Sequence, residues 1–372
     1  MGKCIFYLPY HLDEKAMGAR MLRPRKLIQA FKDIGYEVTV ITGVSSVRRP
    51  LIREVKKQIK NGVKYDFMYT EAHTEPTLLT DPNHLPTHPF LDYSFFRFVR
   101  KHGIKIGLFY PDIYWKFPNY GAALPSWKRV SALKCYRYDV KQFKKYLSKF
   151  YVADMKLCDY LDEKKLTDIA SELLPGADRL TVEPKTYEGR SFRDDPLQIF
   201  YVGGLGGHYE ITDLVKAVSQ INECELTVCC REAEWEKEKE KFSPYLNERI
   251  HIVHKHGEEL EEYYKKADLC SLLFKRADYM EMAKPFKAFE YLAHETPVLS
   301  TKGNAIGDFV EENQIGWNID FDADEISKTL KMIIDDPKLL EEKRKNCAEV
   351  KKVNLWMTRA QQVVDDLKQS EE

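Results

Sequence analysis

A lysine and a glutamate three residues apart, in the segment KPFKAFEYLA at 284–293, have the spacing best suited to chemistry on a nucleotide. If this segment is a helix, Lys287 and Glu290 lie on the same face. A cation beside a helix N-terminus suits a diphosphate, and a carboxylate one turn later suits the two hydroxyls of a ribose. The spacing also describes an ordinary surface ion pair, and taken by itself it favours that simpler interpretation.

A glycine cluster, YVGGLGG at 201–207, stands where a predicted strand becomes a helix. Glycine lets the backbone approach a phosphate, and the first N–H groups of the helix are then available to bind it. Gly203 and Gly204 are therefore candidates for phosphate contact. The alternative is a tight turn that needs a positive φ angle. The spacing G-x-G-x-x-G is absent, which disfavours a dinucleotide dehydrogenase.

An aspartate, Asp112, follows the apolar run IKIGLFY, which predicts a buried strand ending near residue 110. Ligands of open α/β sheets bind outside the carboxyl ends of the strands. A carboxylate half-shielded by aromatic residues at that place could act as a general base on an acceptor hydroxyl, or orient a donor sugar. The alternative is an aspartate that caps the next turn. His73, His84 and His88 lie in a predicted loop, where an exposed role is the simpler interpretation.

Residues 95–151 are rich in basic and aromatic side chains, with 13 Lys and Arg against only Asp112 and Asp139. This combination suits an anionic membrane surface. It would also suit single-stranded nucleic acid, although we favour the membrane. The third interpretation is a solvated helix whose aromatics pack inward. The aromatic residues concerned are Phe95, Phe96, Trp127, Tyr136, Tyr138, Phe143 and Tyr146.

These candidates require two α/β domains to position them. Apolar strand patterns alternate with helical patterns in residues 1–178 and again in 198–354, which predicts two doubly wound parallel sheets facing each other across a cleft. The Gly-, Pro- and charge-rich segment 179–197 is the predicted linker. Residues 355–372 are predicted to form one amphipathic helix that crosses back to the first domain.

Composition limits the class of protein. The 372 residues are 44% hydrophobic and 31% charged, as in an ordinary globular chain. Residues 1–178 carry 30 Lys and Arg against 19 Asp and Glu, while the remainder carries 28 against 39, so we expect the first half to face an anionic partner. No apolar run approaches the length of a membrane span, no signal peptide is evident, and the eight scattered cysteines suggest neither zinc nor disulfides. We expect a cytoplasmic protein.

The run PFKAFEYLA, followed by TPVL at 296–299, resembles the donor-site helix of GT-B glycosyltransferases, particularly the large group 1, family-four-like family with an E-x7-E signature. YVGGL at 201–205 resembles the glycine loop of that family, and YYKKADLCSLLF at 263–274 resembles its following strand. VEENQIGWNID at 310–320 resembles the stretch after the donor site, and Trp356 the start of the last helix. The resemblance is close over residues 198–372 and looser over 1–180.

The resemblance implies the GT-B fold, two Rossmann-like domains facing each other, and transfer of a hexosyl group from a nucleotide-sugar. It implies that Lys287, with Lys284, holds the donor diphosphate, that Glu290 holds the ribose, and that Gly203 and Gly204 line the phosphate side. Since many GT-B enzymes place a glycine and an arginine after the first strand, it also assigns a catalytic role to Arg20, in preference to Arg23. The alternative for this segment is a solvated, basic start of a helix. Asp112 is the second catalytic candidate.

The sequence departs from the family pattern at two places. Met282 occupies the position of the first glutamate of E-x7-E, beside Glu281, and residues 208–210 are His, Tyr and Glu where an arginine and a lysine are expected. The stereochemical outcome, retention or inversion, therefore stays open. An inactive GT-B-like binding subunit and a sugar-nucleotide 2-epimerase are the alternative functions.

The partners that follow are a nucleotide-sugar donor and a glycan or lipid-linked acceptor, as in polysaccharide or glycoconjugate synthesis. An anionic membrane surface is a further expected partner, at residues 95–151, which would make the protein peripheral at the inner face of the membrane. Nucleic acid is not an expected partner. We expect neither a cofactor nor a metal, because GT-B sites can neutralise the leaving diphosphate with lysine and helix dipoles.

Overall fold

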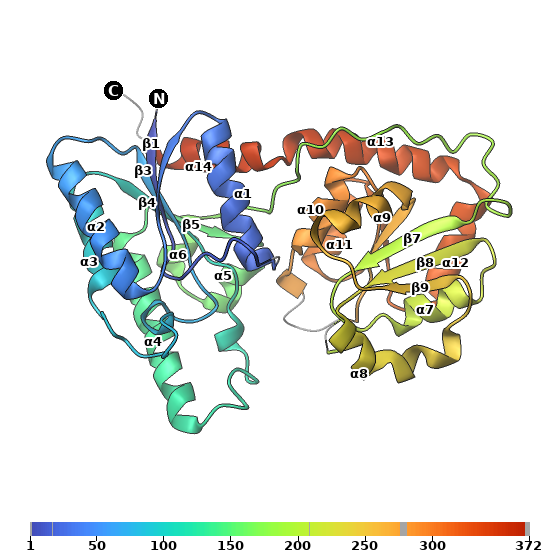
Figure 1. The fold of residues 1–372 in the computed structure, drawn as a ribbon, viewed down its shortest axis with the longest axis horizontal. Coiled ribbons are helices and arrows are strands. Elements are labelled where there is room, and N and C mark those ends of the chain that lie inside the picture. Colours follow the sequence, from blue (N-terminus) through green and yellow to red (C-terminus); the bar gives the residue numbers. More distant parts are fainter. Residues whose placement is uncertain (1, 17, 208, 276–280, 369–372) are drawn as a thin grey trace. The chain divides into compact units, whose positions relative to one another are not determined.

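The computed structural model describes residues 2–16, 18–207, 209–275 and 281–368. The chain forms two compact units. Unit 1 comprises Met1–Leu174 together with Trp356–Glu372, and unit 2 comprises Pro175–Leu355. Each unit is built on a six-stranded sheet whose described strand pairs are all parallel (Figure 1).

The sheet of unit 1 has the strand order β2-β1-β3-β4-β5-β6. Its strands are β1 (Lys3–Tyr7), β2 (Glu37–Ile41), β3 (Phe67–Glu71), β4 (Lys105–Phe109), β5 (Lys149–Val152) and β6 (Ala170–Glu172). The central strands are buried on both faces, as expected when helices cover a parallel sheet. This explains why their sequences are continuous apolar runs.

The helices of unit 1 connect these strands and cover the sheet (Figure 1). They are α1 (Ala19–Asp33), α2 (Ser45–Lys60), α3 (Leu91–Lys101), α4 (Ser126–Tyr146), α5 (Lys156–Leu161) and α6 (Lys164–Thr167), with 3-10 turns η1 (Thr77–Leu79) and η2 (Tyr114–Lys116). The last helix, α14 (Trp356–Leu367), packs on α1 and β4. A Cβ atom at Gly107 of β4 would lie 2.7 Å from the Leu367 side chain, so this glycine admits the helix.

The sheet of unit 2 has the order β12-β11-β10-β7-β8-β9. Its strands are β7 (Leu197–Val202), β8 (Cys224–Cys229), β9 (Ile250–Val253), β10 (Leu269–Leu272), β11 (Val298–Thr301) and β12 (Gly316–Ile319). Its helical elements are α7 (Thr212–Ser219), α8 (Glu232–Phe242), η3 (Ser243–Tyr245), η4 (Gly257–Leu260), α9 (Glu261–Lys266), α10 (Phe286–Ala293), α11 (Ala305–Glu312), α12 (Ala323–Asp335) and α13 (Lys338–Val353).

The segment before β7 is irregular but anchored to unit 2. Its described residues 179–196 form no helix or strand. The fully buried carboxylate of Asp268 accepts hydrogen bonds from Lys185 at 3.2 Å, Tyr187 at 3.2 Å and Arg190 at 2.8 Å. Several donors offset the cost of burying this charge and hold the segment against the sheet.

Candidate functional site

The predicted donor helix at 284–293 is α10 with the two residues that precede it, and it is fixed to the centre of the sheet of unit 2. The Tyr291 hydroxyl accepts a hydrogen bond from the Val202 N–H at 3.3 Å and lies 3.4 Å from the Ser271 carbonyl oxygen. These contacts reach β7 and β10, which are neighbours in the sheet. The helix therefore stands beside the carboxyl end of β7, where the glycine loop begins.

The two candidate side chains of α10 contact each other. The Lys287 ammonium forms an ion pair with Oε2 of Glu290, and both side chains are half-buried. The Tyr264 hydroxyl donates to the same carboxylate oxygen at 2.8 Å, and its ring stacks on His294 at 4.3 Å. The Lys287–Glu290 contact is the ion pair that the spacing alone suggested. It also holds a cation and a carboxylate next to each other on one face of the helix.

Tyr264 contacts the candidate pair and was missed by sequence reasoning. It lies on α9 and fixes the orientation of the Glu290 carboxylate. Burial and the Glu290 charge raise the pKa of the Tyr264 hydroxyl, which therefore stays protonated and acts as a donor. The only signal in the sequence was its place in the YYKKAD segment.

The glycine loop is held in one conformation by its neighbours. The Gly203 N–H donates to the Cys229 carbonyl at 3.1 Å, and the Tyr201 hydroxyl donates to the Gly204 carbonyl at 2.6 Å. A Cβ atom at Gly203 would lie 2.7 Å from the Tyr201 hydroxyl oxygen, so a larger residue there would force the Tyr201 side chain to move. Positive φ angles occur later, at Gly206 and Gly207. At Gly203 and Gly204 the reason for glycine is therefore the close approach of the Tyr201 and Tyr209 side chains, and not a positive φ angle.

The topology places this loop where a ligand is expected. β7 lies between β10 and β8, so the connections leaving β7 and β10 diverge at this point of the sheet. Such a switch point is the usual binding crevice of an open α/β sheet. The glycine loop also contacts a carboxylate. Glu234 of α8 accepts the Leu205 N–H at 3.2 Å and forms an ion pair with Arg231 at 2.6 Å.

The departures from the family pattern fall beside α10 and the glycine loop. Met282 is buried, with 6% of its surface exposed, so an apolar contact replaces the charge of the first glutamate. Glu281 and Lys284 are half-buried and precede the helix. Of residues 208–210, His208 lies outside the described residues, and Glu210 accepts from the Thr212 N–H at 3.0 Å in a local turn.

In unit 1, Asp112 follows β4 and is half-buried. Its Oδ1 accepts the Tyr114 N–H, the first of η2, at 3.1 Å, which is a turn contact of the kind that the simpler interpretation expected. Burial raises the pKa of Asp112, and the charge of Arg20 opposes that shift. The two catalytic candidates are therefore electrostatic neighbours although 92 residues separate them in the sequence.

Arg20 lies in the first turn of α1 and is exposed. Its Nη1 is 3.4 Å from Nε2 of His73, and the His73 ring packs on Tyr10 with ring centroids 4.8 Å apart. Burial and Arg20 lower the pKa of His73 to about 4, so this ring is neutral at physiological pH. His73 is thus next to the candidate site, whereas the sequence favoured an exposed loop residue.

Arg23 has a different role from Arg20. It is buried, with its guanidinium 3.6 Å from the centre of the Phe109 ring. Its Nε donates to Glu71 at 3.2 Å, and Nη2 donates to the Leu173 carbonyl at 3.2 Å. Arg23 therefore joins the end of β3 to the residue that follows β6. Because Arg23 is engaged in this packing, Arg20 stays the preferred residue for contact with a ligand.

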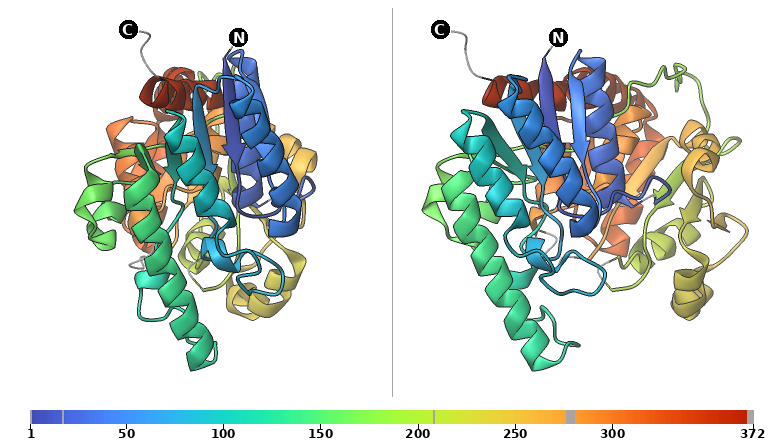
Figure 2. Two further views of the ribbon diagram at one scale, coloured as in Figure 1. Left: turned by 90° about the vertical axis from the view of Figure 1, so that its left-hand side faces the viewer. Right: turned by 60° about the vertical axis from the view of Figure 1, so that its left-hand side comes forward.

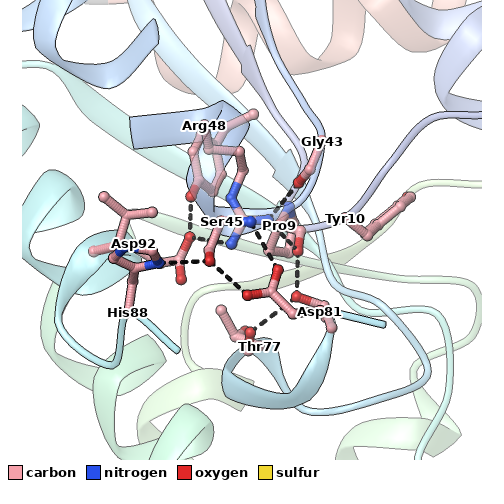
Figure 3. A network of polar contacts seen from close by, with 12 residues as sticks. Pro9, Tyr10, Gly43, Ser45, Arg48, Thr77, Asp81, His88 and Asp92 are labelled. Atoms are coloured by element: carbon pink, nitrogen blue, oxygen red, sulfur yellow. Dashed lines mark hydrogen bonds and ion pairs between the residues drawn. The ribbon is translucent and has the colours of Figure 1, made fainter. Parts of the chain in front are cut away.

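The remaining loop histidines take part in the packing of unit 1 or lie on its surface. His88 is half-buried and its Nδ1 is 2.7 Å from the Ser45 hydroxyl, which donates to Asp81 at 2.5 Å (Figure 3). In the same network Arg48 pairs with Asp92 at 3.0 Å and donates to the carbonyls of Pro9 and Gly43 (Figure 3). The network braces the loops that follow β1 and β2. His84 is exposed, 3.5 Å from Glu75.

Most aromatics of residues 95–151 pack inward, as the third interpretation of that stretch proposed. Those buried in the core of unit 1 are Phe95, Phe96, Tyr136, Phe143 and Tyr146, and Tyr138 is half-buried. Trp127 differs, since 68% of its surface is exposed. Helical spacing was the missed signal, because Tyr136, Val140 and Phe143 recur at intervals of four and three residues in α4.

Two further findings concern metals and membranes. Within the part of the chain that the structure describes, no group of three or more His, Cys, Asp or Glu residues could hold a metal ion. None of the described helices is both long and apolar enough to span a membrane.

Comparisons with known proteins agree with this architecture. Residues 184–352 match the family model described as "Glycosyl transferases group 1". A search of the curated proteins finds no match. Among solved structures, sucrose-phosphate synthase (tll1590) from Thermosynechococcus elongatus is similar with a TM-score of 0.63 and 16% identity, covering 98% of each chain. Anabaena Alr3699/HepE in complex with UDP-glucose gives 0.61 and 11%, covering 97% of this chain and 98% of the other.

A glycosyltransferase from Rickettsia africae ESF-5 gives a TM-score of 0.62 and 13% identity, covering 99% of this chain and 100% of the other. At such identities the structural likeness supports the fold, and the family match supports the activity. Both sheets, the glycine loop and α10 fit the expected architecture. Residues 184–352 belong to the glycosyl transferases group 1 family, and the chain is a glycosyltransferase of the GT-B fold.

Proposed function

We propose that the protein transfers a sugar from a nucleoside-diphosphate sugar to a hydroxyl of a glycan or lipid-linked acceptor, in the synthesis of a polysaccharide or glycoconjugate. The observation that carries this proposal is the group Lys287–Glu290–Tyr264 on a helix fixed beside the glycine loop. Lysine and loop amides suit the diphosphate, and the oriented carboxylate suits the ribose. UDP is the first nucleotide to test, because the similar Anabaena structure contains UDP-glucose.

In the proposed reaction the oxygen of the acceptor hydroxyl forms a bond with the anomeric carbon of the donor sugar. The bond from that carbon to the diphosphate oxygen breaks, and its electron pair leaves with the nucleoside diphosphate. The hydroxyl proton goes to Asp112, whose raised pKa suits it as a base. Arg20, beside Asp112, contacts a phosphate or the acceptor.

We propose that the reaction needs no metal cofactor. The developing charge on the diphosphate is met by Lys287 and by the Gly204 amide, with Lys284 preceding the helix. Gly203, whose own N–H donates to the Cys229 carbonyl, lines the phosphate side. Transfer should then continue after treatment with a chelator. Activity that disappears with EDTA and returns with Mg²⁺ or Mn²⁺ would overturn this part of the proposal.

We propose that the protein acts at the inner face of a membrane, to which the N-terminal end of α4 attaches. That end projects from unit 1 (Figure 2). Trp127 and Val130, one turn apart, are 68% and 51% exposed, and Leu124 before them is 45% exposed. From Lys116 to Lys145 the chain carries eight lysines and arginines, and its one acidic residue, Asp139, is buried. Exposed aromatic and apolar residues beside cations suit anionic lipid.

Calorimetry of the full chain against UDP, GDP, ADP, CMP and dTDP tests the donor half of the proposal. We expect one nucleotide to bind with clear preference, and its sugar conjugates to be hydrolysed or transferred. A folded chain that binds none of the five would contradict the proposed function. Nucleotide binding without turnover on any acceptor would instead favour the inactive binding subunit.

A further inference from the structure

Unit 1 has a topological switch point of its own, where the order of the strands reverses. β1 lies between β2 and β3, so the connections leaving β1 and β3 diverge. Tyr10 and Arg20 belong to the connection after β1, and His73 belongs to the connection after β3. Ligands of open α/β sheets bind at such a switch point. The contacts between these three residues therefore lie where a ligand is expected on topology alone.

Two hydrogen-bond donors approach the ring of His73. A neutral imidazole has one acceptor nitrogen and one N–H donor. The Glu75 N–H lies 3.2 Å from Nδ1, and Arg20 Nη1 lies 3.4 Å from Nε2. Both neighbours are donors, and the single lone pair of the ring can serve only one of them. Whichever tautomer is present, the ring accepts from only one of these two donors, so the other donor and the ring N–H are available to an oxygen of water or of a ligand.

The ring is held in place. Tyr10 packs on it, and the Tyr10 carbonyl accepts from the Gly43 N–H at 2.9 Å and the Thr42 hydroxyl at 2.6 Å. The Tyr136 hydroxyl donates to the carbonyl of Thr74, the next residue after His73. Donors positioned in advance by such a framework bind a ligand at lower entropic cost.

The charges around the ring favour an anion. Arg20 brings a permanent positive charge, and guanidinium groups bind carboxylate and phosphate through paired hydrogen bonds. The acidic groups facing the pair are Asp112, which interacts with Arg20, and Glu75, whose Oε2 is 3.8 Å from Nδ1 of His73. Glu75 lies on the Nδ1 side, so it leaves the Nε2 side and Arg20 to the ligand.

We propose that Arg20 and His73 bind an oxyanion of the acceptor substrate, a phosphate or a carboxylate group. This inference rests on the proposed function, and it specifies the class of acceptor. An acceptor anchored in this way by its anionic group would present its hydroxyl to Asp112, the electrostatic neighbour of Arg20.

Nuclear magnetic resonance of the full chain labelled with ¹⁵N-histidine tests the proposal, because it reports the protonation of each ring nitrogen. His73→Gln assigns the His73 signals. Inorganic phosphate, acetate and UDP are then titrated separately. We expect phosphate or acetate to shift the His73 signals and to raise the pKa of its ring, since a nearby anion favours the imidazolium. A response to phosphate but not acetate assigns a phosphorylated acceptor, and the reverse assigns a carboxylate.

Arg20→Gln should weaken the binding of that anion about tenfold, as expected for loss of a charged hydrogen bond, and Arg20→Lys should restore part of it. Lys32→Gln, an exposed cation on the same helix, is the matched control and should change nothing. His73 signals that ignore both anions, or an unchanged affinity in Arg20→Gln, would overturn the proposal. A response to UDP alone would assign the position to the donor diphosphate and also overturn it.

Calorimetry with UDP on the same samples separates this inference from the proposed function. Unchanged UDP affinity in Arg20→Gln, with loss of the phosphate or acetate response, supports the inference. If no nucleotide binds to the wild-type chain while phosphate still moves the His73 signals, the proposed donor is wrong and the anion site stands.

Discussion

Lys287 and Glu290 form an ion pair on one face of α10, although each is a candidate for a different part of the donor. A bound nucleotide must take over part of this contact, with phosphate replacing carboxylate at the ammonium. Lys287→Ala should therefore weaken nucleoside diphosphate binding by roughly 1.5–3 kcal/mol, the value of a hydrogen bond to a charged group. Calorimetry measures the change. Lys328→Ala breaks a comparable exposed pair with Glu325 and should have no effect. Equal affinities in the two variants would remove Lys287 from the site.

The role of Glu290 can be tested on the ribose. Glu290→Gln keeps the size of the side chain but loses an acceptor for the ribose hydroxyls, so donor KM should rise and turnover should fall. The wild-type chain should prefer UDP to 2′-deoxy-UDP, and Glu290→Gln should lose most of that preference. Tyr264→Phe, which removes the hydrogen bond orienting the carboxylate, should give an intermediate result. A preference that survives in Glu290→Gln would show that another group holds the ribose.

The elements could be predicted from the sequence because their patterns are local. Strands buried on both faces of a parallel sheet must be continuous apolar runs, and KCIFY and LQIFYV are both of this kind. Gly35, with a φ of 91°, follows the end of α1, where glycine commonly terminates a helix. Lys287 and Glu290 could be paired for the same reason, since three residues along a helix fix their neighbourhood.

Contacts between distant segments could not be predicted in this way. Arg20 meets His73 across 53 residues, and Arg23 meets Glu71 across 48. Nothing local distinguishes the exposed arginine from the buried one. Which of the two faces a ligand depends on the sheet order, because β1 and β3 become neighbours only when the sheet forms.

Asp112 should control the acidic side of the pH profile. Asp112→Asn removes the proposed base, and positioned proton transfer is typically worth a factor of about 10²–10⁴. Turnover should fall by about a hundredfold or more, while UDP affinity should barely change. Because burial raises the pKa of the carboxyl, wild-type kcat/KM should rise with pH through a value above that of a free aspartate. That rise should be absent in the variant. A variant that loses stability but keeps its turnover per folded molecule would make Asp112 only a cap for η2.

Asp139 should make the stability of the protein depend on pH. It is buried in α4, where the Tyr93 hydroxyl donates to it at 2.5 Å and the Thr77 N–H at 2.7 Å, and burial raises its pKa to about 7. Because the pKa is raised in the folded state, protonated Asp139 contributes its full stabilisation of the fold below the ordinary pKa of an aspartate. That contribution is lost as pH rises through about 7. The change is on the order of 4 kcal/mol at about 1.4 kcal/mol per pH unit.

Melting temperatures of the wild type and Asp139→Asn, compared from pH 4 to pH 8, measure this effect. The difference between them should change in favour of the variant as pH rises, because the amide carries no charge to bury. Asp168→Asn, an exposed aspartate of the same unit, is the control. A difference that stays constant with pH would show that Asp139 does not titrate in this range.

Membrane attachment should depend on the end of α4 and not on the rest of residues 95–151, whose aromatics are mostly in the core. Trp127→Ser combined with Val130→Ser should reduce sedimentation with vesicles containing anionic phosphatidylserine or phosphatidylglycerol, since both apolar side chains lose their contact with lipid. Val353→Ser on α13, where the side chain is 64% exposed, is the matched control and should bind as the wild type does. Binding of the wild type should also weaken with salt, because the cations of α4 supply part of the attraction. If the wild-type protein does not bind anionic vesicles at low salt, a soluble acceptor is favoured. If the double serine variant binds as the wild type does, the attachment lies elsewhere on the chain.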